Sequence, residues 1–166
     1  MSRTSFELQL TKLQEDVLAL GSMVQEALLE SMEHLKARDI AASKLLIKRD
    51  QIIDDKRYAI EADALALIAM QQPMAGDMRM IAASLFIANE LERIGDYAKS
   101  LGRVNVRIGD EPLMKPLIDM PRMTTQAEAM LGRALQAYVQ RDVHLAQAVI
   151  QEDAIVDDLY DQIYAE

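Results

Sequence analysis

Apolar or small side chains recur at alternating steps of four and three residues near the start of the chain, and this spacing constrains the fold most. The series is Phe6, Leu10, Leu13, Val17, Leu20, Val24, Ala27 and Ser31. Such a seam is typical of long helices that pack nearly antiparallel in bundles. It predicts a first helix that is roughly 50 Å long and ends near Ala37.

Turn signals divide the remaining chain into further helices. Asp39 is placed to cap the next helix, Pro73 ends it, and a segment with several prolines follows Gly109. The expected helices cover about 4–37, 39–72, 77–106, 121–140 and 142–166. Short connections favour antiparallel neighbours, so we expect an all-α antiparallel helical bundle. We divide it into a three-helix unit over 1–108, a linker over 109–120 and a partial unit over 121–166.

The second part of the sequence repeats the first. Residues 38–63 align without gaps on residues 141–166, with nine identities in 26 positions. The match includes a turn, where Arg38 and Asp39 correspond to Arg141 and Asp142, as well as an Asp-rich helix. An internal repeat of this size indicates two copies of one supersecondary unit.

Acidic residues follow an apolar stretch in the third expected helix. Residues 80–88 are apolar except for Ser84, and a helix that is apolar on all sides belongs in the middle of a packed domain. Asn89, Glu92 and Asp96 then fall within about 60° of one another on the helix surface. We therefore expect a row of oxygen donors inside the bundle, where carboxylates need a pairing partner or a cation.

This stretch resembles the signature helix of the PhoU family of phosphate-signalling regulators. The run from Glu90 to Asp96 reads ELERIGD, with Glu92 and Asp96 as an ExxxD pair. The preceding residues 72–79 also resemble the approach to that helix. The resemblance implies a bundle of two three-helix repeats, with an ExxxD pair in each repeat.

The chain departs from this family pattern in its second repeat. The equivalent of the third helix, with its ExxxD pair, has no counterpart in residues 121–166. We therefore expect an uncovered apolar groove where a sixth helix would pack. Its consequences would be a homodimer, exchange of a helix between copies or instability, and we expect a homodimer.

Clustered carboxylates suit hard cations, and iron or manganese also accept them. Family resemblance favours divalent or ferric ions (Fe, Zn, Mn or Mg) held by Glu92, Asp96, Asn89 and Asp54. Asp54 has a simpler interpretation as part of an exposed helix face with ion pairs. We expect Glu90 and Arg93 to form ion pairs or support the site, and Asp153 and Asp157 to form a second-repeat metal site. The alternative for the whole cluster is neutralisation by Arg93 or by a lysine from another helix.

Composition excludes several function classes. A net charge of −9 argues against binding nucleic acid through its phosphates. No apolar run is long enough to insert in a membrane, no signal-peptide core is present and no cysteine occurs, so we expect a cytoplasmic protein. The sequence also lacks a Gly-rich phosphate loop, a GxSxG elbow and the Glu-x-x-His pairs of di-iron bundles. We therefore expect no enzymatic activity.

The resemblance implies a regulator that restrains phosphate uptake and the phosphate-starvation response. It would do so by linking a phosphate ABC transporter ATPase to a phosphate sensor histidine kinase. Two alternatives stay open from the residues alone. One is a carboxylate-bridged metal-binding bundle with an enzymatic or storage role, and the other is a plain helical scaffold module.

Overall fold

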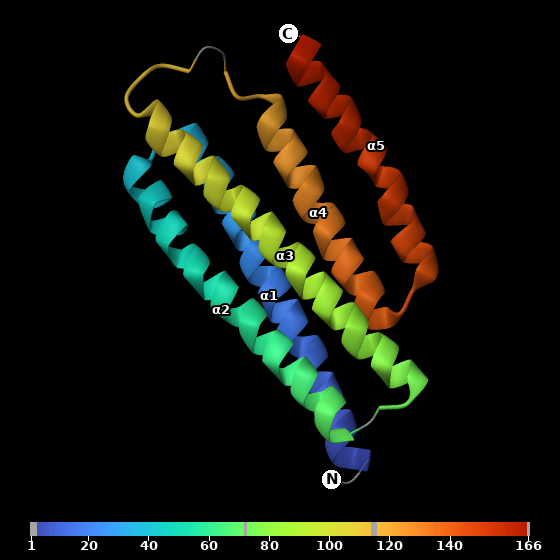
Figure 1. Ribbon diagram of the computed structural model, residues 1–166. Coiled ribbons are helices and arrows are strands. Elements are labelled where there is room, and N and C mark those ends of the chain that lie inside the picture. Colours follow the sequence, from blue (N-terminus) through green and yellow to red (C-terminus); the bar gives the residue numbers. More distant parts are fainter. Residues whose placement is uncertain (1–2, 72, 114–115, 166) are drawn as a thin grey trace.

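A computed structural model describes residues 3–71, 73–113 and 116–165. Its helices are α1 (Arg3–Ala37), α2 (Ile40–Gln71), α3 (Ala75–Ile108), α4 (Asp119–Gln140) and α5 (Val143–Ala165). Each lies within a few residues of an expected helix, and no strand occurs in the described residues. The all-α antiparallel bundle is confirmed, and the proline-containing segment forms the long loop between α3 and α4 (Figure 1).

The first three helices pack on one another and enclose the core. The seam of α1 is buried from Phe6 to Val24, as its spacing predicts. It meets the buried face of α2, which repeats every seven residues, and the small residues of α3. Gly95 lies against Ile53 and Gly102 lies against Leu46, so these glycines allow the close approach of α2 and α3.

The two inter-helix turns of the repeat have the same geometry. Arg38 and Arg141 both adopt a left-handed conformation, with φ of 59° and 54°. The Asp39 carboxylate accepts a hydrogen bond from the Ala42 N–H at 2.8 Å, and the Asp142 carboxylate accepts one from the Leu145 N–H at 3.0 Å. These aspartates cap α2 and α5, so the sequence repeat is also a structural repeat.

An interhelical ion pair occurs at equivalent places in both repeats, with its charges exchanged. Arg49 of α2 lies 3.1 Å from Glu30 of α1. In the second repeat Arg133 of α4 pairs with Glu152 of α5. The acid and the base have changed helices while the position of the pair is kept.

Helices α1 and α4 join the two repeats as an antiparallel pair. The Gln25 amide donates to the Glu128 carboxylate at 2.7 Å, and these two residues occupy equivalent positions in the two repeats. Gly21 faces Leu135 a turn away. The repeats are therefore related by a pseudo-two-fold axis that passes close to this contact.

Helix α5 packs against α4 alone among the described elements. Apolar side chains of α3, α4 and α5 line a trough. In Figure 1, α4 lies between α3 and α5. Ile87, Leu131, Tyr138, Val149 and Ile150 are among the residues that line the trough. It lies on the uncovered side of the second repeat, where the repeat comparison predicts an exposed groove.

Candidate carboxylate site

The acidic row of α3 lies beside the buried face of the helix. Ala88, Leu91 and Gly95 point into the core, so Glu92 and Asp96, each one residue further along, are rotated about 100° away from it. The Asp96 side chain is 51 % exposed. The expectation that these oxygens lie inside the bundle is therefore wrong for Asp96 and also for Asn89, which is exposed.

The apolar segment before the acidic row is also less enclosed than expected. Met80, Ile81, Ser84 and Ala88 are buried, but Phe86 is 73 % exposed. A helix that is apolar on every side gives no indication of how it is rotated about its axis. The packing of α1 and α2 selects the face with small residues, and it leaves Phe86 beside the trough.

Helices α2 and α3 bring four carboxyl groups together at this edge of the core. Asp50 and Asp54 come from α2, and Glu92 and Asp96 come from α3. We call these four residues the carboxylate cluster. The sequence-based interpretation that Asp54 belongs with Glu92 and Asp96 agrees with this arrangement.

Two members of the carboxylate cluster, Asp54 and Glu92, have raised pKa values. Burial raises the pKa of Asp54, and the charges of Asp50 and Asp96 raise it further. Burial likewise raises the pKa of Glu92, with added contributions from the Asp96 charge and from a hydrogen bond with Asp96. Both groups therefore hold a proton more tightly in the folded protein than in an unfolded chain, and a bound cation would relieve this repulsion.

Lys99 neutralises one end of the carboxylate cluster. Its ammonium group donates a hydrogen bond to Asp50, which is only 5 % exposed, and lies 3.4 Å from Asp96. The hydrogen bond to Asp50 is the main cause of the raised pKa of Lys99. Asp50 is thus compensated inside the protein by Lys99.

Glu90 and Arg93 form an ion pair with each other, as one of the sequence-based interpretations expects. The Arg93 guanidinium lies 2.8 Å from the Glu90 carboxylate, and both side chains are well exposed. The hydrogen bond from Arg93 to Glu90 is the largest contribution to the raised pKa of Arg93. Arg93 therefore points away from the carboxylate cluster, and Lys99 provides the compensating charge.

The second repeat lacks an equivalent cluster in the described residues. Asp153 and Asp157 occupy the positions on α5 that correspond to Asp50 and Asp54, and both are exposed. In the first repeat, α3 packs beside Asp50 and supplies the Lys99 that pairs with it. The expectation that Asp153 and Asp157 bind a metal stays a prediction.

Sequence reasoning missed the role of Lys99. The signal was present, because Lys99 follows Asp96 by three residues and Glu92 by seven, which places all three on one side of α3. Its partner Asp50 belongs to an acidic stripe of α2 that also contains Asp54, one turn further along the helix. Which member of that stripe would be buried depended on how the two helices pack.

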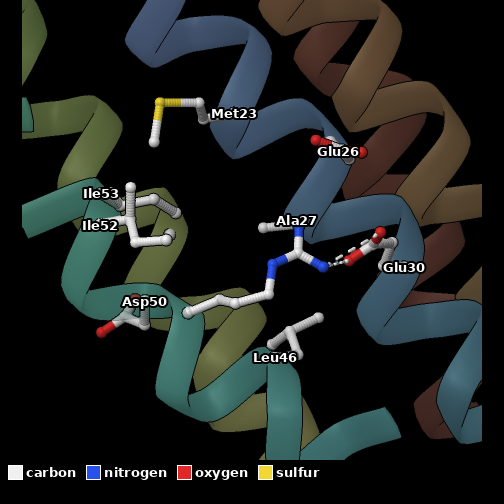
Figure 2. A pocket seen from close by; sticks show the side chains of 10 residues that line it. Met23, Glu26, Ala27, Glu30, Leu46, Asp50, Ile52 and Ile53 are labelled. Carbon is white, nitrogen blue, oxygen red and sulfur yellow. Dashed lines mark hydrogen bonds and ion pairs between the residues drawn. The ribbon is translucent and has the colours of Figure 1, made fainter.

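A small pocket lies between α1 and α2 on the other side of Asp50 (Figure 2). Met23, Ala27, Ile52 and Ile53 supply its apolar walls, while Glu26 and Glu30 stand at its α1 edge. The ion pair between Arg49 and Glu30 crosses it. The pocket therefore adjoins the carboxylate cluster, because Asp50 belongs to both, and Gly95 of α3 also lines it.

In the part of the chain that the structure describes, no three acidic, histidine or cysteine side chains meet closely enough to hold a metal ion as they stand. Within the same residues, no helix is sufficiently long and apolar to cross a bilayer. Metal binding at the carboxylate cluster stays a prediction.

Comparisons with known proteins identify the family. The PhoU domain model matches residues 17–104 and 120–166. A phosphate-specific transport system accessory protein PhoU homolog from Clostridium acetobutylicum is 35 % identical over the whole chain, which spans 76 % of that protein. A homolog of the same name from Aquifex aeolicus is 34 % identical over 96 % of the chain and 72 % of its own length.

Solved structures show the same fold. PhoU from Pseudomonas aeruginosa superposes with a TM-score of 0.88 at 26 % identity, covering 95 % of this chain and 76 % of the other. The phosphate transport system regulatory protein PhoU from Streptococcus pneumoniae gives 0.87 at 25 % identity, covering 95 % and 74 %. Together with the ELERIGD run and the two-repeat helical fold, these matches show that the chain belongs to the PhoU domain family.

Proposed function

We propose that this protein is a non-catalytic regulator of phosphate transport. It restrains phosphate uptake and the phosphate-starvation response by linking a phosphate ABC transporter ATPase to a phosphate sensor histidine kinase. The observation that carries the proposal is family membership over nearly the whole chain, together with relatives named as accessory proteins of the phosphate-specific transport system.

The structure supports a docking role through its long exposed helices. Its described residues form helices and connecting loops without an enclosed substrate site, and the carboxylate cluster opens at the surface between α2 and α3. A site of this kind changes the charge of a docking face when it takes up a cation. We propose that cation binding there tunes the affinity for the transporter ATPase or the kinase.

The donor set of the carboxylate cluster fits a hard cation. Asp54, Glu92 and Asp96 are the residues that would hold the ion. Burial first, and the neighbouring carboxylates second, raise the pKa values of Asp54 and Glu92, and a positive charge would offset both contributions. A bound ion would supply positive charge and fixed coordination geometry. Lys99 competes with it for Asp96, so the cation would have to displace or reorient the lysine side chain.

A complementation experiment tests the function. A strain that lacks the gene should take up labelled phosphate faster and express a phosphate-starvation reporter in phosphate-replete medium. The wild-type gene should restore both readouts, whereas Glu92→Gln with Asp96→Asn should not. Glu15→Gln with Glu26→Gln removes two exposed carboxyls of α1 and serves as the matched control. If the deletion leaves uptake and reporter unchanged, the regulatory role is wrong.

Capture experiments test the partners. Tagged protein from phosphate-replete cells should recover the transporter ATPase and the sensor kinase after mild cross-linking. Recovery of neither protein, with the complementing tagged protein in place, would contradict the linking role and leave phosphate regulation to another mechanism.

Elemental analysis tests the cation separately. Protein loaded with Fe, Zn, Mn or Mg and then desalted should retain one of these metals, and the Glu92→Gln with Asp96→Asn variant should lose most of it. Retention by the Glu15→Gln with Glu26→Gln control shows that the loss is local. No metal in any of the three proteins means that the carboxylate cluster acts only through its pairing with Lys99.

A further inference from the structure

Lys99 lies on α3 between two glycines at which α2 comes close. Gly95 is one turn before it and Gly102 is about one turn after it, and side chains of α2 contact both glycines. The Lys99 side chain is only 20 % exposed. Its ammonium group donates to Asp50 of α2 and lies 3.4 Å from Asp96 of its own helix. The lysine is therefore held between two members of the carboxylate cluster.

The two carboxylates hold this ammonium group unequally. The Asp50 side chain is 5 % exposed, and a buried charge depends strongly on its partner. The Asp96 side chain is 51 % exposed, so water solvates its charge and its pair with Lys99 contributes little. Asp50 therefore fixes the ammonium group beside α2, and Asp96 keeps most of its capacity to bind another cation.

A second basic side chain near the carboxylate cluster has partners outside it. The charge of Arg57 acts on the cluster, but its guanidinium lies 2.5 Å from the Glu61 carboxylate. It also stacks over the Tyr58 ring, 3.7 Å from the ring centroid. Both partners belong to α2 and hold the guanidinium there. Lys99 is therefore the cation whose position depends on a member of the carboxylate cluster.

We propose that Asp50 is a positioning residue of the carboxylate cluster, which holds the Lys99 ammonium so that the lysine does not close on the oxygens that would take a cation. Without the Asp50 charge, the lysine would pair with Asp96 and Glu92, which lie three and seven residues before it on the same side of α3. It would then neutralise the site from within the protein. This inference rests on the proposed cation site, and it adds a residue that keeps the site open.

The effect of a freed lysine should depend on the charge of the bound ion, because Coulomb repulsion is proportional to that charge. At about 6 Å near a protein surface, repulsion by one ammonium group raises the dissociation constant of a divalent ion about tenfold. For a trivalent ion the logarithm of this change is half as large again, which gives about thirtyfold. A purely structural disturbance of the cluster has no reason to follow the ion charge in this way.

Equilibrium dialysis of metal-free protein against Mn²⁺ or Tb³⁺ tests the inference. Asp50→Asn should weaken Mn²⁺ binding by about tenfold or more relative to wild type. Lys99→Met added to Asp50→Asn should recover most of that loss, although it does not restore the missing carboxylate. The recovery should be about tenfold for Mn²⁺ and about thirtyfold for Tb³⁺. Circular dichroism and urea unfolding check that each variant is folded under the conditions of dialysis.

The ion pair between Asp16 and Lys56 provides the matched control, because it joins α1 and α2 with the same two residue types. Lys56→Met added to Asp16→Asn should change the Mn²⁺ affinity by less than about twofold. Equal Mn²⁺ affinity of Asp50→Asn and its double variant, with binding lost in Glu92→Gln with Asp96→Asn, would overturn the role of Asp50 and leave the cation site standing. No binding by any of these proteins, wild type included, would overturn the cation site and this inference with it.

Discussion

The two repeats share their local structure and differ in what covers them. Asp50 is buried and paired with Lys99 of α3, whereas the equivalent Asp153 is exposed on α5. The turns that precede these helices have the same caps and the same left-handed arginine. The difference teaches that local sequence determines the turn, whereas a third helix determines burial and the electrostatic environment.

The end of α3 shows what the third helix contributes. The buried Asn105 amide donates to the carbonyl oxygens of His34 and Asp39 at 3.0 and 3.3 Å and to the Ser43 hydroxyl at 2.9 Å. The corresponding residues of the second repeat are Ala137, Asp142 and Ala146, and they line the trough. The trough thus has the position that α3 fills in the first repeat.

The largest expected effect comes from breaking the buried pair of the first repeat. Lys99→Met should lower the free energy of unfolding by about 3–5 kcal/mol at neutral pH, because it leaves the Asp50 charge buried and uncompensated. Urea unfolding measures the change. Asp50→Asn added to Lys99→Met should recover most of it, and Asp153→Asn should stay within about 0.5 kcal/mol of wild type. Equal losses at Asp50 and Asp153 would contradict the comparison.

Removal of the amide that ties α3 to the first turn should have the next largest effect. Asn105→Ala should cost about 2–3 kcal/mol, because the buried Ser43 hydroxyl loses its amide partner and the carbonyls of His34 and Asp39 each lose one of two donors. Thermal unfolding measures the loss. Ala146→Ser, which introduces the first-repeat hydroxyl at the equivalent place in the open trough, should be nearly neutral. A neutral Asn105→Ala would mean that α3 is held by its apolar contacts alone.

A smaller effect is expected where the first repeat touches the second. The Tyr138 hydroxyl of α4 lies 2.7 Å from the Ser84 hydroxyl of α3, and burial raises the pKa of Tyr138. Tyr138→Phe should therefore cost about 1 kcal/mol of unfolding free energy. Amide hydrogen exchange should speed up along α4 and α5 more than along α2. Uniform acceleration through all helices would show that the two repeats unfold as one unit.

The smallest effect, and the one with a distinctive pH dependence, concerns Glu92. Because the pKa of Glu92 is raised, the folded state binds this proton more tightly than the unfolded chain does. The protonated carboxyl group therefore contributes stability at low pH, and this contribution is lost as pH rises through the folded-state pKa. Glu92→Gln should therefore be more stable than wild type by a few tenths of a kcal/mol at pH 7 in metal-free buffer. The gain should disappear near pH 4.

Added metal should make the wild type more stable than Glu92→Gln, the reverse of their order in metal-free buffer. A cation held by the carboxylate cluster stabilises the wild type through its preferential binding to the folded state, and Glu92→Gln would lack that gain. Urea unfolding with and without the ion separates the two contributions. A wild type that is more stable than Glu92→Gln in metal-free buffer would contradict the repulsion described for the cluster.

Much of the fold could be predicted because its signals are local. The seam from Phe6 to Val24, the caps at Asp39 and Asp142 and the stop at Pro73 each act over a few residues. The candidate site was harder to predict. The spacing of Glu92 and Asp96 was evident, but their exposure depended on the rotation of α3, and an all-apolar stretch does not specify that rotation.

The sequence by itself determined the helices, their turns, the repeat and the family, because hydrophobic periodicity, capping and a long signature run are properties of neighbouring residues. The tertiary structure alone decided that Lys99 compensates Asp50 and that Asp96 faces outward. These features arise where helices distant in sequence meet, and the free energy of burying a charge or an apolar face depends on which neighbour covers it.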